Sequence, residues 1–394
     1  MGVYGAAAGR ARDAEAARAA HPRARGLGGN RRPADRHLPP ADPGRLAPHR
    51  NDVGQAVPSR PRPAVPVSRR RSREVLSLDS VTALLRVVEP GLFTTVQDLG
   101  RPNAIAAGVP PGGAMDRFAH RAANLLIGNA ETDATLECTL SGPHLLAERA
   151  FVIAITGADF EPRINGAQVA TWTGIFMSAG DRLTFGARRS GGRAYISVAG
   201  GIEADRWLGS ASTNLMAARG GVHGRNLKAG DQLSAASAAG KPAVSGHHLP
   251  DRLRPRYSDH TLFAIVGPHV RRLDPEARHL LFGAEFKVSH EADRMGYRLD
   301  GPKLAISGDE LLSFGLAAGA IQVPRAGQPI LLMADHQTAG GYPVVATVAS
   351  ASMPVAGQLV PGDDLRFAET TIERARLMRH SQAAALDTLR DTSA

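Results

Sequence analysis

Short β-rich runs punctuated by glycine turns are the feature that most constrains the fold of this chain. They begin near Leu84 and recur to the end of the body. Examples are Phe151-Val-Ile-Ala-Ile155, Ala194-Tyr-Ile-Ser-Val198, Thr261-Leu-Phe-Ala-Ile-Val266 and Ile330-Leu-Leu-Met333. This spacing, with few helical patterns between the runs, predicts a mainly β fold of barrel or sandwich type rather than a βαβ fold.

Three segments carry helix signals. Residues 113–127 place apolar residues at helical spacing, with Asp116 near the start and Gly128 just past the end. Asp274-Pro275-Glu276 reads as an N-cap, a proline in the first turn and a first-turn acid, ahead of a short helix that ends near Gly283. Residues 368–391 predict a C-terminal surface helix.

The first eighty residues have a different texture. They are rich in Arg, Ala and Pro, hold 10 of the 27 prolines and contain no Lys. Apolar residues show no strand or helix period there, which predicts a disordered tail. A targeting peptide is a second interpretation, although Asp13, Glu15 and Asp35 argue against it. We favour a third, in which translation properly starts near Val81 and the preceding residues are an artefact of a start site placed too far upstream.

The formal charge of +10 is concentrated in that tail. Residues 1–80 hold 16 Lys and Arg against 7 Asp and Glu, a net of +9, and the remainder holds 31 against 30, a net of +1. The near-neutral body gives no reason to expect nucleic-acid or membrane binding. The sequence contains no run of about 18 apolar residues, so we expect no membrane-spanning helix. It also contains no recognisable secretory signal, so we expect a cytoplasmic protein.

A short pattern recurs along the body. Ala179-Gly-Asp-Arg-Leu-Thr-Phe185 and Pro361-Gly-Asp-Asp-Leu-Arg-Phe367 share Gly-Asp-x-Leu-x-Phe, and Ala229-Gly-Asp-Gln-Leu233 is a shorter echo. The repeat suggests two related β units, unless Gly-Asp is simply a good turn. We therefore divide the chain into a tail (1–80), subdomain A (81–245), subdomain B (246–370) and a C-terminal helix or tail (371–394).

Common catalytic motifs are missing. The chain has no P-loop, no H-E-x-x-H zinc motif, no G-x-S-x-G elbow and no Met-Lys-Met biotin site, so we expect no metal and no biotin on this chain. Cys138 is the sole cysteine, which excludes an internal disulfide, and a buried small hydrophobe is favoured over a catalytic thiol.

Polar residues gather instead in glycine-rich loops, where backbone N–H groups and arginine forks suit anions. The loops are 94–101 with 113–116, 289–298, and 321–324 with 335–343. The candidate catalytic residues are Asp98, Arg101, Asp116, Arg294 and Asp335, and the candidate substrate-binding residues are Gln97, Tyr297, Arg298, Gln322, Gln337 and Tyr342.

Several of these candidates have a plainer interpretation. Asp98 and Arg101 can form a loop salt bridge, Asp116 can cap a helix, the pair Asp293 and Arg294 can be a solvated turn, and Tyr342 can pack.

If residues 294–298 are extended, Arg294 and Arg298 share one face and Tyr297 takes the other. In the same way, Asp335 and Gln337 share a face if their segment is extended. We expect Arg294 and Asp335 to open on one cleft near Tyr342; the alternative is a salt bridge that locks their two loops.

Read in order, the body resembles the family that includes the carboxyltransferase-like subunit of bacterial 5-oxoprolinase, KipA and the carboxyltransferase region of urea carboxylase. The similarity runs from about Leu84 to Phe367 and leaves out the tail. Two positions depart from the family pattern, at His269 after Gly-Pro and at Phe314 after Ser313. The segments that carry the similarity include Val96-Gln-Asp-Leu-Gly-Arg101, Gly113-Ala-Met-Asp116, Leu136-Glu137, Asp293-Arg-Met-Gly-Tyr-Arg-Leu299, Gly319-Ala-Ile-Gln-Val-Pro324 and Gly340-Gly-Tyr-Pro343.

The resemblance implies two cyclophilin-like β-barrel subdomains with a cleft between them. It implies two partners, one KipI-like and the other a lactam-utilisation protein, in a complex that uses ATP to open 5-oxo-L-proline to L-glutamate. Two other functions stay open. One is a biotin-dependent carboxyltransferase acting on urea or a related amide, and the other is a non-catalytic regulatory partner of a KipI-like protein.

Overall fold

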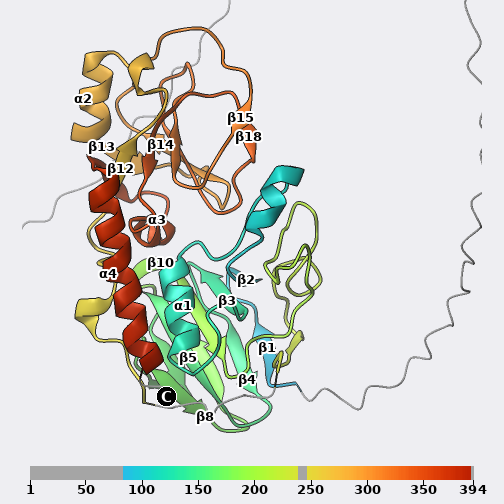
Figure 1. The fold of residues 1–394 in the computed structure, drawn as a ribbon. Helices are drawn as coiled ribbons and strands as arrows, with labels where there is room; N and C mark the ends of the chain where they lie inside the picture. The colour runs from blue at the N-terminus through green and yellow to red at the C-terminus, as the bar shows by residue number, and fades with distance from the viewer. Residues whose placement is uncertain (1–82, 238–245, 392–394) are drawn as a thin grey trace, which may run out of the picture. The chain divides into compact units, whose positions relative to one another are not determined.

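The computed structural model describes residues 83–237 and 246–391 (Figure 1). The expectations for residues 1–80 lie outside the described residues. Within the described residues the chain is mainly β with few helices, which confirms the predicted fold class. None of the described helices is both long and apolar enough to cross a membrane.

The first half folds into two sheets that face one another across a shared core. The six-stranded sheet has the order β11-β1-β4-β9-β6-β7 and the five-stranded sheet the order β2-β3-β10-β5-β8. Their bounds are β1 Leu85–Glu89, β2 Phe93–Gln97, β3 Thr135–Thr139, β4 His144–Ala147, β5 Phe151–Asp159, β6 Pro162–Ile164, β7 Ala167–Gln168, β8 Gly174–Met177, β9 Arg182–Phe185, β10 Ser190–Val198 and β11 Gln232–Leu233.

Burial along these strands follows their sequences. Leu85 and Val87 of β1 are buried while Arg86 between them is exposed, as expected for a strand with one face in the core. β5 and β10 are buried almost throughout, because the other sheet covers one of their faces and helix α1 (Arg117–Leu125) packs against the other. Cys138 lies in this core, as predicted, and burial raises the pKa of its thiol to about 12.

The second half is a closed seven-stranded barrel in the order β12-β19-β16-β17-β14-β13-β20. β12 pairs in parallel with β20 and closes the ring. The barrel strands are β12 Thr261–Val266, β13 Glu285–Val288, β14 Gly296–Asp300, β16 Ala320–Gln322, β17 Ile330–Leu332, β19 Val344–Val348 and β20 Asp364–Glu369, and β15 Phe314–Gly315 pairs with β18 Ala339–Gly340 beside it.

The three predicted helices are present. α1 and α2 (Pro275–Gly283) are each capped by an aspartate, Asp116 and Asp274, whose side chain accepts from the backbone N–H three residues later. α3 is Met353–Gln358 and α4 is Ile372–Asp391. Figure 1 shows α4 lying alongside α1, which agrees with the packing between them, and α3 near the end of α1.

The recurring Gly-Asp pattern marks the same turn three times. Asp181, Asp231 and Asp363 each accept a hydrogen bond from the backbone N–H three residues earlier, at 2.7, 2.8 and 2.9 Å. The preceding glycine has φ of +88°, +91° and +93°, a conformation that glycine adopts without steric cost. Each turn leads directly into β9, β11 or β20. A local turn therefore explains the pattern, and the proposed duplication and domain limits stay predictions.

Candidate functional site

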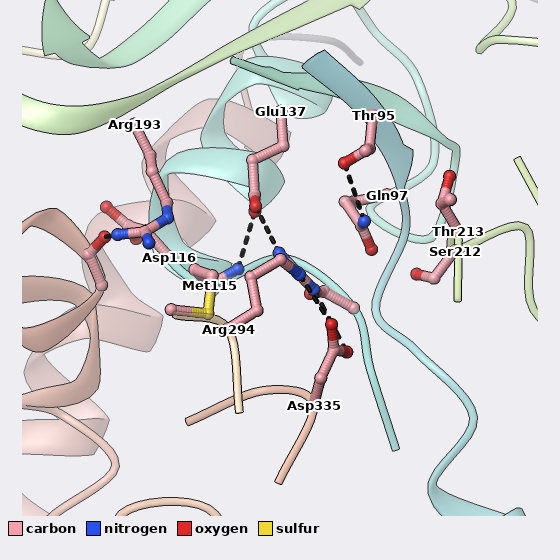
Figure 2. A network of polar contacts seen from close by, with 12 residues as sticks. Thr95, Gln97, Met115, Asp116, Glu137, Arg193, Ser212, Thr213, Arg294 and Asp335 are labelled. Carbon is pink, nitrogen blue, oxygen red and sulfur yellow. Dashed lines mark hydrogen bonds and ion pairs between the residues drawn. The ribbon is translucent and has the colours of Figure 1, made fainter. Parts of the chain in front are cut away.

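Arg294 is the centre of the candidate site, because its guanidinium crosses from the barrel to the first half (Figure 2). Its Nε donates to Asp335 Oδ2 at 2.8 Å, its Nη2 to Gly113 O at 2.7 Å, and its Nη1 to Glu137 Oε1. Burial alone would lower the pKa of Arg294, but the carboxylates of Asp335 and Glu137 outweigh burial and raise it. The guanidinium therefore stays charged and links the first half of the chain to the barrel.

Glu137 lies on β3 and its side chain is fully buried. Its second oxygen, Oε2, accepts from the backbone N–H of Met115 and from the hydroxyl of Tyr195, both at 2.8 Å. The Tyr195 oxygen in turn accepts from Asp116 N at 2.7 Å. Sequence reasoning gave Glu137 no role, although a lone acid within a buried apolar strand was a usable signal.

Asp116 caps α1, so the plainer interpretation of this residue is confirmed. Its Oδ1 accepts from Ala119 N at 2.9 Å, and its Oδ2 accepts from the Tyr257 hydroxyl at 2.6 Å and from Gln358 Nε2 at 2.9 Å. Burial raises the pKa of this carboxyl to about 6 even though its hydrogen bonds work in the opposite direction.

Arg193 on β10 makes a second junction between the halves and was also missed. Its Nη1 donates to the Tyr297 hydroxyl at 2.9 Å and to Gly357 O at 2.5 Å. Gln358 Oε1 accepts from the backbone N–H of Arg193 at 2.9 Å. Tyr297, a candidate substrate-binding residue, is buried in the core of the barrel. An arginine inside a buried strand was the available signal.

Both carboxylate oxygens of Asp98 accept hydrogen bonds. Its Oδ1 accepts from the hydroxyls of Ser210 and Ser212, both at 2.6 Å, and from Gly100 N at 2.7 Å, while Oδ2 accepts from Ala211 N at 2.7 Å. Burial would raise the pKa of Asp98, but these hydrogen bonds outweigh burial and lower it. A carboxylate held in this way is a poor base, and it forms no ion pair with Arg101. Asp98 positions the loop that covers Arg101.

Arg101 and Gln97 each leave one buried polar atom unused. Arg101 donates from Nη2 to Ser212 O and from Nε to Trp207 O at 3.4 Å, and its guanidinium stacks 5.0 Å from the Trp207 ring. Its Nη1 has no hydrogen-bond partner among the described residues. Gln97 donates from Nε2 to Thr95 Oγ1 at 2.9 Å, and its Oε1 likewise has no partner there. Because buried polar groups are normally paired, a free donor and a free acceptor four residues apart point to a ligand.

Gly112 brings the free donor close to the ion pair. A Cβ atom on this residue would lie 3.0 Å from Arg101 Nη1 and 3.4 Å from Asp335 Oδ1. Its φ of +64° is also a conformation that favours glycine. Arg101, Asp335 and, through Asp335, Arg294 therefore converge on one stretch of bare backbone. Three of the five predicted catalytic residues meet here.

Arg294 and Asp335 form the ion pair that was the alternative interpretation, and this pair joins their two loops, while their shared opening on a cleft near Tyr342 stays a prediction. Arg298 does not share their face, so that prediction is wrong. Its side chain is 60% exposed and pairs with Glu291 at 3.0 Å. The alternation rule fails because β14 begins only at Gly296, which leaves Arg294 in the preceding turn.

The remaining candidates lie on the barrel. Gln322 is buried and its Nε2 donates to the backbone oxygen of Tyr342 at 3.4 Å. Gln337 and the side chain of Tyr342 are exposed. In the described part of the chain no hydrogen bond or ion pair joins these three to Arg294 or Asp335. Asp335 lies in a turn rather than a strand, so its shared face with Gln337 is not formed.

Comparison with known proteins agrees with this architecture. Residues 107–369 match the family described as carboxyltransferase domain, subdomain A and B. The chain is 37% identical over 302 residues to the C subunit of 5-oxoprolinase from Escherichia coli, covering 76% of this chain and 95% of that protein. It is 34% identical to urea amidolyase of Lachancea kluyveri, covering 80% of this chain but 18% of that protein.

A solved structure gives the same result. The urea amidolyase of K. lactis superposes with a TM-score of 0.74 at 33% identity, covering 79% of this chain and 20% of that one. The resemblance inferred from the sequence motifs is thereby confirmed. This chain belongs to the carboxyltransferase domain family with subdomains A and B.

Proposed function

We propose that the chain is one subunit of a cytoplasmic, ATP-dependent 5-oxoprolinase that opens 5-oxo-L-proline to L-glutamate. The similarity to the C subunit of 5-oxoprolinase over 95% of that protein supports a subunit of the same kind. The observation that carries the proposal is two buried polar atoms without a hydrogen-bond partner among the described residues, Gln97 Oε1 and Arg101 Nη1, the second of which faces the bare backbone of Gly112.

The substrate offers groups that match these atoms. A 5-oxoproline molecule has a lactam N–H to donate, and a carboxylate and a lactam oxygen to accept. Gln97 Oε1 suits the N–H, and Arg101 Nη1 suits a carboxylate or the negative charge that develops on the lactam oxygen. Arg294 is an unsuitable anion ligand because Asp335, Glu137 and Gly113 already use its donors. Its role in the proposal is to hold Asp335 in place.

The covering loop must move for substrate to reach these atoms. Arg101 is 2% exposed beneath the carbonyls of Trp207 and Ser212. We therefore propose that the segment 207–212 moves away before substrate enters. In this movement the Trp207 ring separates from the guanidinium of Arg101.

ATP supplies the driving force in this scheme. Transfer of its terminal phosphoryl group to the lactam oxygen releases ADP and activates the ring carbon. Water adds to that carbon and the C–N bond breaks to give the acyl phosphate of glutamate, with the ring nitrogen leaving as the amine. A second water molecule then hydrolyses the acyl phosphate to glutamate and phosphate. Because the sequence has no P-loop, we assign the turnover to a complex with two partners, a KipI-like protein and a lactam-utilisation protein.

A second candidate is a carboxyltransferase acting on urea or a related amide, which the similarity to the two urea amidolyases favours. Urea has N–H donors for Gln97 but no carboxylate for Arg101. A biotin carrier on another chain would be required.

Reconstitution tests the proposal. Purified chain should release no 5-oxoproline-dependent ADP until both partner proteins are added, and urea should not replace 5-oxoproline. Gln97→Leu should then cut turnover of an assembled complex by about tenfold at subsaturating 5-oxoproline, through loss of one hydrogen bond to the substrate. Full turnover by that variant would assign the chain a non-catalytic role, and urea-dependent carboxyl transfer with a biotinylated carrier would favour the second candidate.

A further inference from the structure

A cleft of about 950 Å³ lies between α1, the N-terminal half of α4 and the barrel residues 347–354. Its basic lining residues are Arg117 and Arg121 from α1 with Arg376, Arg379 and His380 from α4. No Asp or Glu is among the described residues that line it. Two facing helices thus place basic side chains around one cleft. Positively charged side chains so close together repel one another unless an anion lies between them.

Three of these arginines are free to bind. The side chains of Arg117, Arg376 and Arg379 make no hydrogen bond or ion pair in the part of the chain that the structure describes. Arg121, by contrast, is neutralised by Glu131. Arg117 is the first residue of α1, where the helix dipole disfavours a cation and favours an anion.

Most of the other lining residues are apolar, with Thr347, Ser350 and Gln382 as polar exceptions. Phe118 of α1 and Met353 and Pro354 of the barrel half contribute large side chains, and Ile265 and Val348 lie beside them. Cavities of roughly 300–1,000 Å³ with an apolar wall and a few convergent polar groups are typical of small-molecule sites. An apolar wall opposite free guanidinium groups suits a ligand with an anionic end and an apolar or aromatic body.

We propose that this cleft binds a phosphorylated small molecule of nucleotide size, with its phosphoryl groups at Arg117 and Arg379 and its body against Phe118 and Met353. The planar fork of a guanidinium matches the spacing of phosphoryl oxygens. The inference does not depend on the reaction proposed above, since it concerns binding by the isolated chain.

Isothermal titration of the full chain with ATP, tripolyphosphate and adenosine provides the test. ATP should bind saturably at one site and raise the melting temperature, tripolyphosphate should bind more weakly, and adenosine should bind weakest. Arg117→Ala and Arg379→Ala should each weaken ATP binding by about tenfold or more. Arg325→Ala is the matched control, because Arg325 is exposed on the barrel and does not line the cleft.

The outcomes separate clearly. Absence of saturable ATP binding would overturn the proposal. So would an equal effect of Arg325→Ala, or tripolyphosphate binding as tightly as ATP, since either result means attraction of any polyanion to a basic surface. Both test arginines are exposed, so the variants should fold, and circular dichroism checks that they do. Turnover is not measured, so failure here leaves the proposed reaction untouched.

Discussion

The guanidinium of Arg294 in the barrel neutralises the carboxylate of Glu137, which is fully buried in the first half. Removing one partner of a buried ion pair leaves the other charge buried without a partner, which is strongly destabilising. An exposed ion pair contributes little to the free energy of unfolding. Arg294→Ala and Glu137→Gln should each lower the free energy of unfolding by about 3–5 kcal/mol. Urea denaturation of both variants and of the double variant measures the coupling between the two side chains.

Arg298→Ala is the matched control for Arg294→Ala. Arg298 lies four residues away and pairs with Glu291, but its side chain is 60% exposed. Its removal should change stability by less than about 1 kcal/mol. If the two arginine variants lose equal stability, the barrel is not held to the first half through Arg294.

The pH dependence of stability should reveal two buried groups with opposite effects. Burial raises the pKa of Asp116 to about 6, so the folded state keeps a proton that the unfolded state has lost, and stability falls as pH rises from about 4 to 6. Burial lowers the pKa of His120 to about 4, so the unfolded state binds the extra proton, and stability rises between about 4 and 6.5. The two contributions oppose each other in the wild type.

Single substitutions should separate them. Asp116→Asn should leave a profile in which stability rises from pH 4 to 6.5, and His120→Gln should leave one in which it falls from pH 4 to 6. Each contribution is on the order of 3 kcal/mol. Urea unfolding at half-unit pH steps reads the slopes, and identical slopes in the two variants would contradict the assignment.

Much of the fold could be predicted because its signals are local. Alternating apolar residues set the strands, and each Gly-Asp turn is closed by an aspartate within three residues of its donor. The cap of α1 by Asp116 is likewise local. Local patterns therefore predicted the strands given as examples and the helices α1, α2 and α4, but not α3.

The junction could not be predicted in the same way. Glu137 and Arg294 are 157 positions apart in the sequence, and Arg193 and Gln358 are 165 apart, so no local pattern relates them. Arg298 was misplaced for a local reason that the pattern did not reveal. The Asp293 side chain accepts from the backbone N–H groups of Met295 and Gly296, at 2.8 and 3.1 Å, which makes a turn where an extended segment was expected.

Gly112→Ala should impair the site more than the fold. The new Cβ would lie 3.0 Å from Arg101 Nη1 and crowd the free donor, and the positive φ adds backbone strain of roughly 1–2 kcal/mol. Gly108→Ala is a close control, since Gly108 has φ of +76° and nothing within 4 Å of a Cβ. Both variants should lose similar stability in thermal melts. Only Gly112→Ala should lose substrate-dependent ATP hydrolysis in the reconstituted complex, and equal loss in both would contradict a site at Gly112.

Trp207 should report the opening of the loop over Arg101. Its ring stacks 5.0 Å from the guanidinium, so displacement of the loop by substrate should change its fluorescence. The other tryptophan, Trp172, is buried in a separate core cluster and should stay constant. Titration of the complex with 5-oxoproline should therefore give a saturable signal that Trp207→Phe abolishes. Gln97→Leu should weaken binding by about tenfold through loss of one hydrogen bond to the substrate, and the signal should shift to higher substrate concentration. A signal that persists in Trp207→Phe, or that is unchanged in Gln97→Leu, would place the substrate elsewhere in the complex.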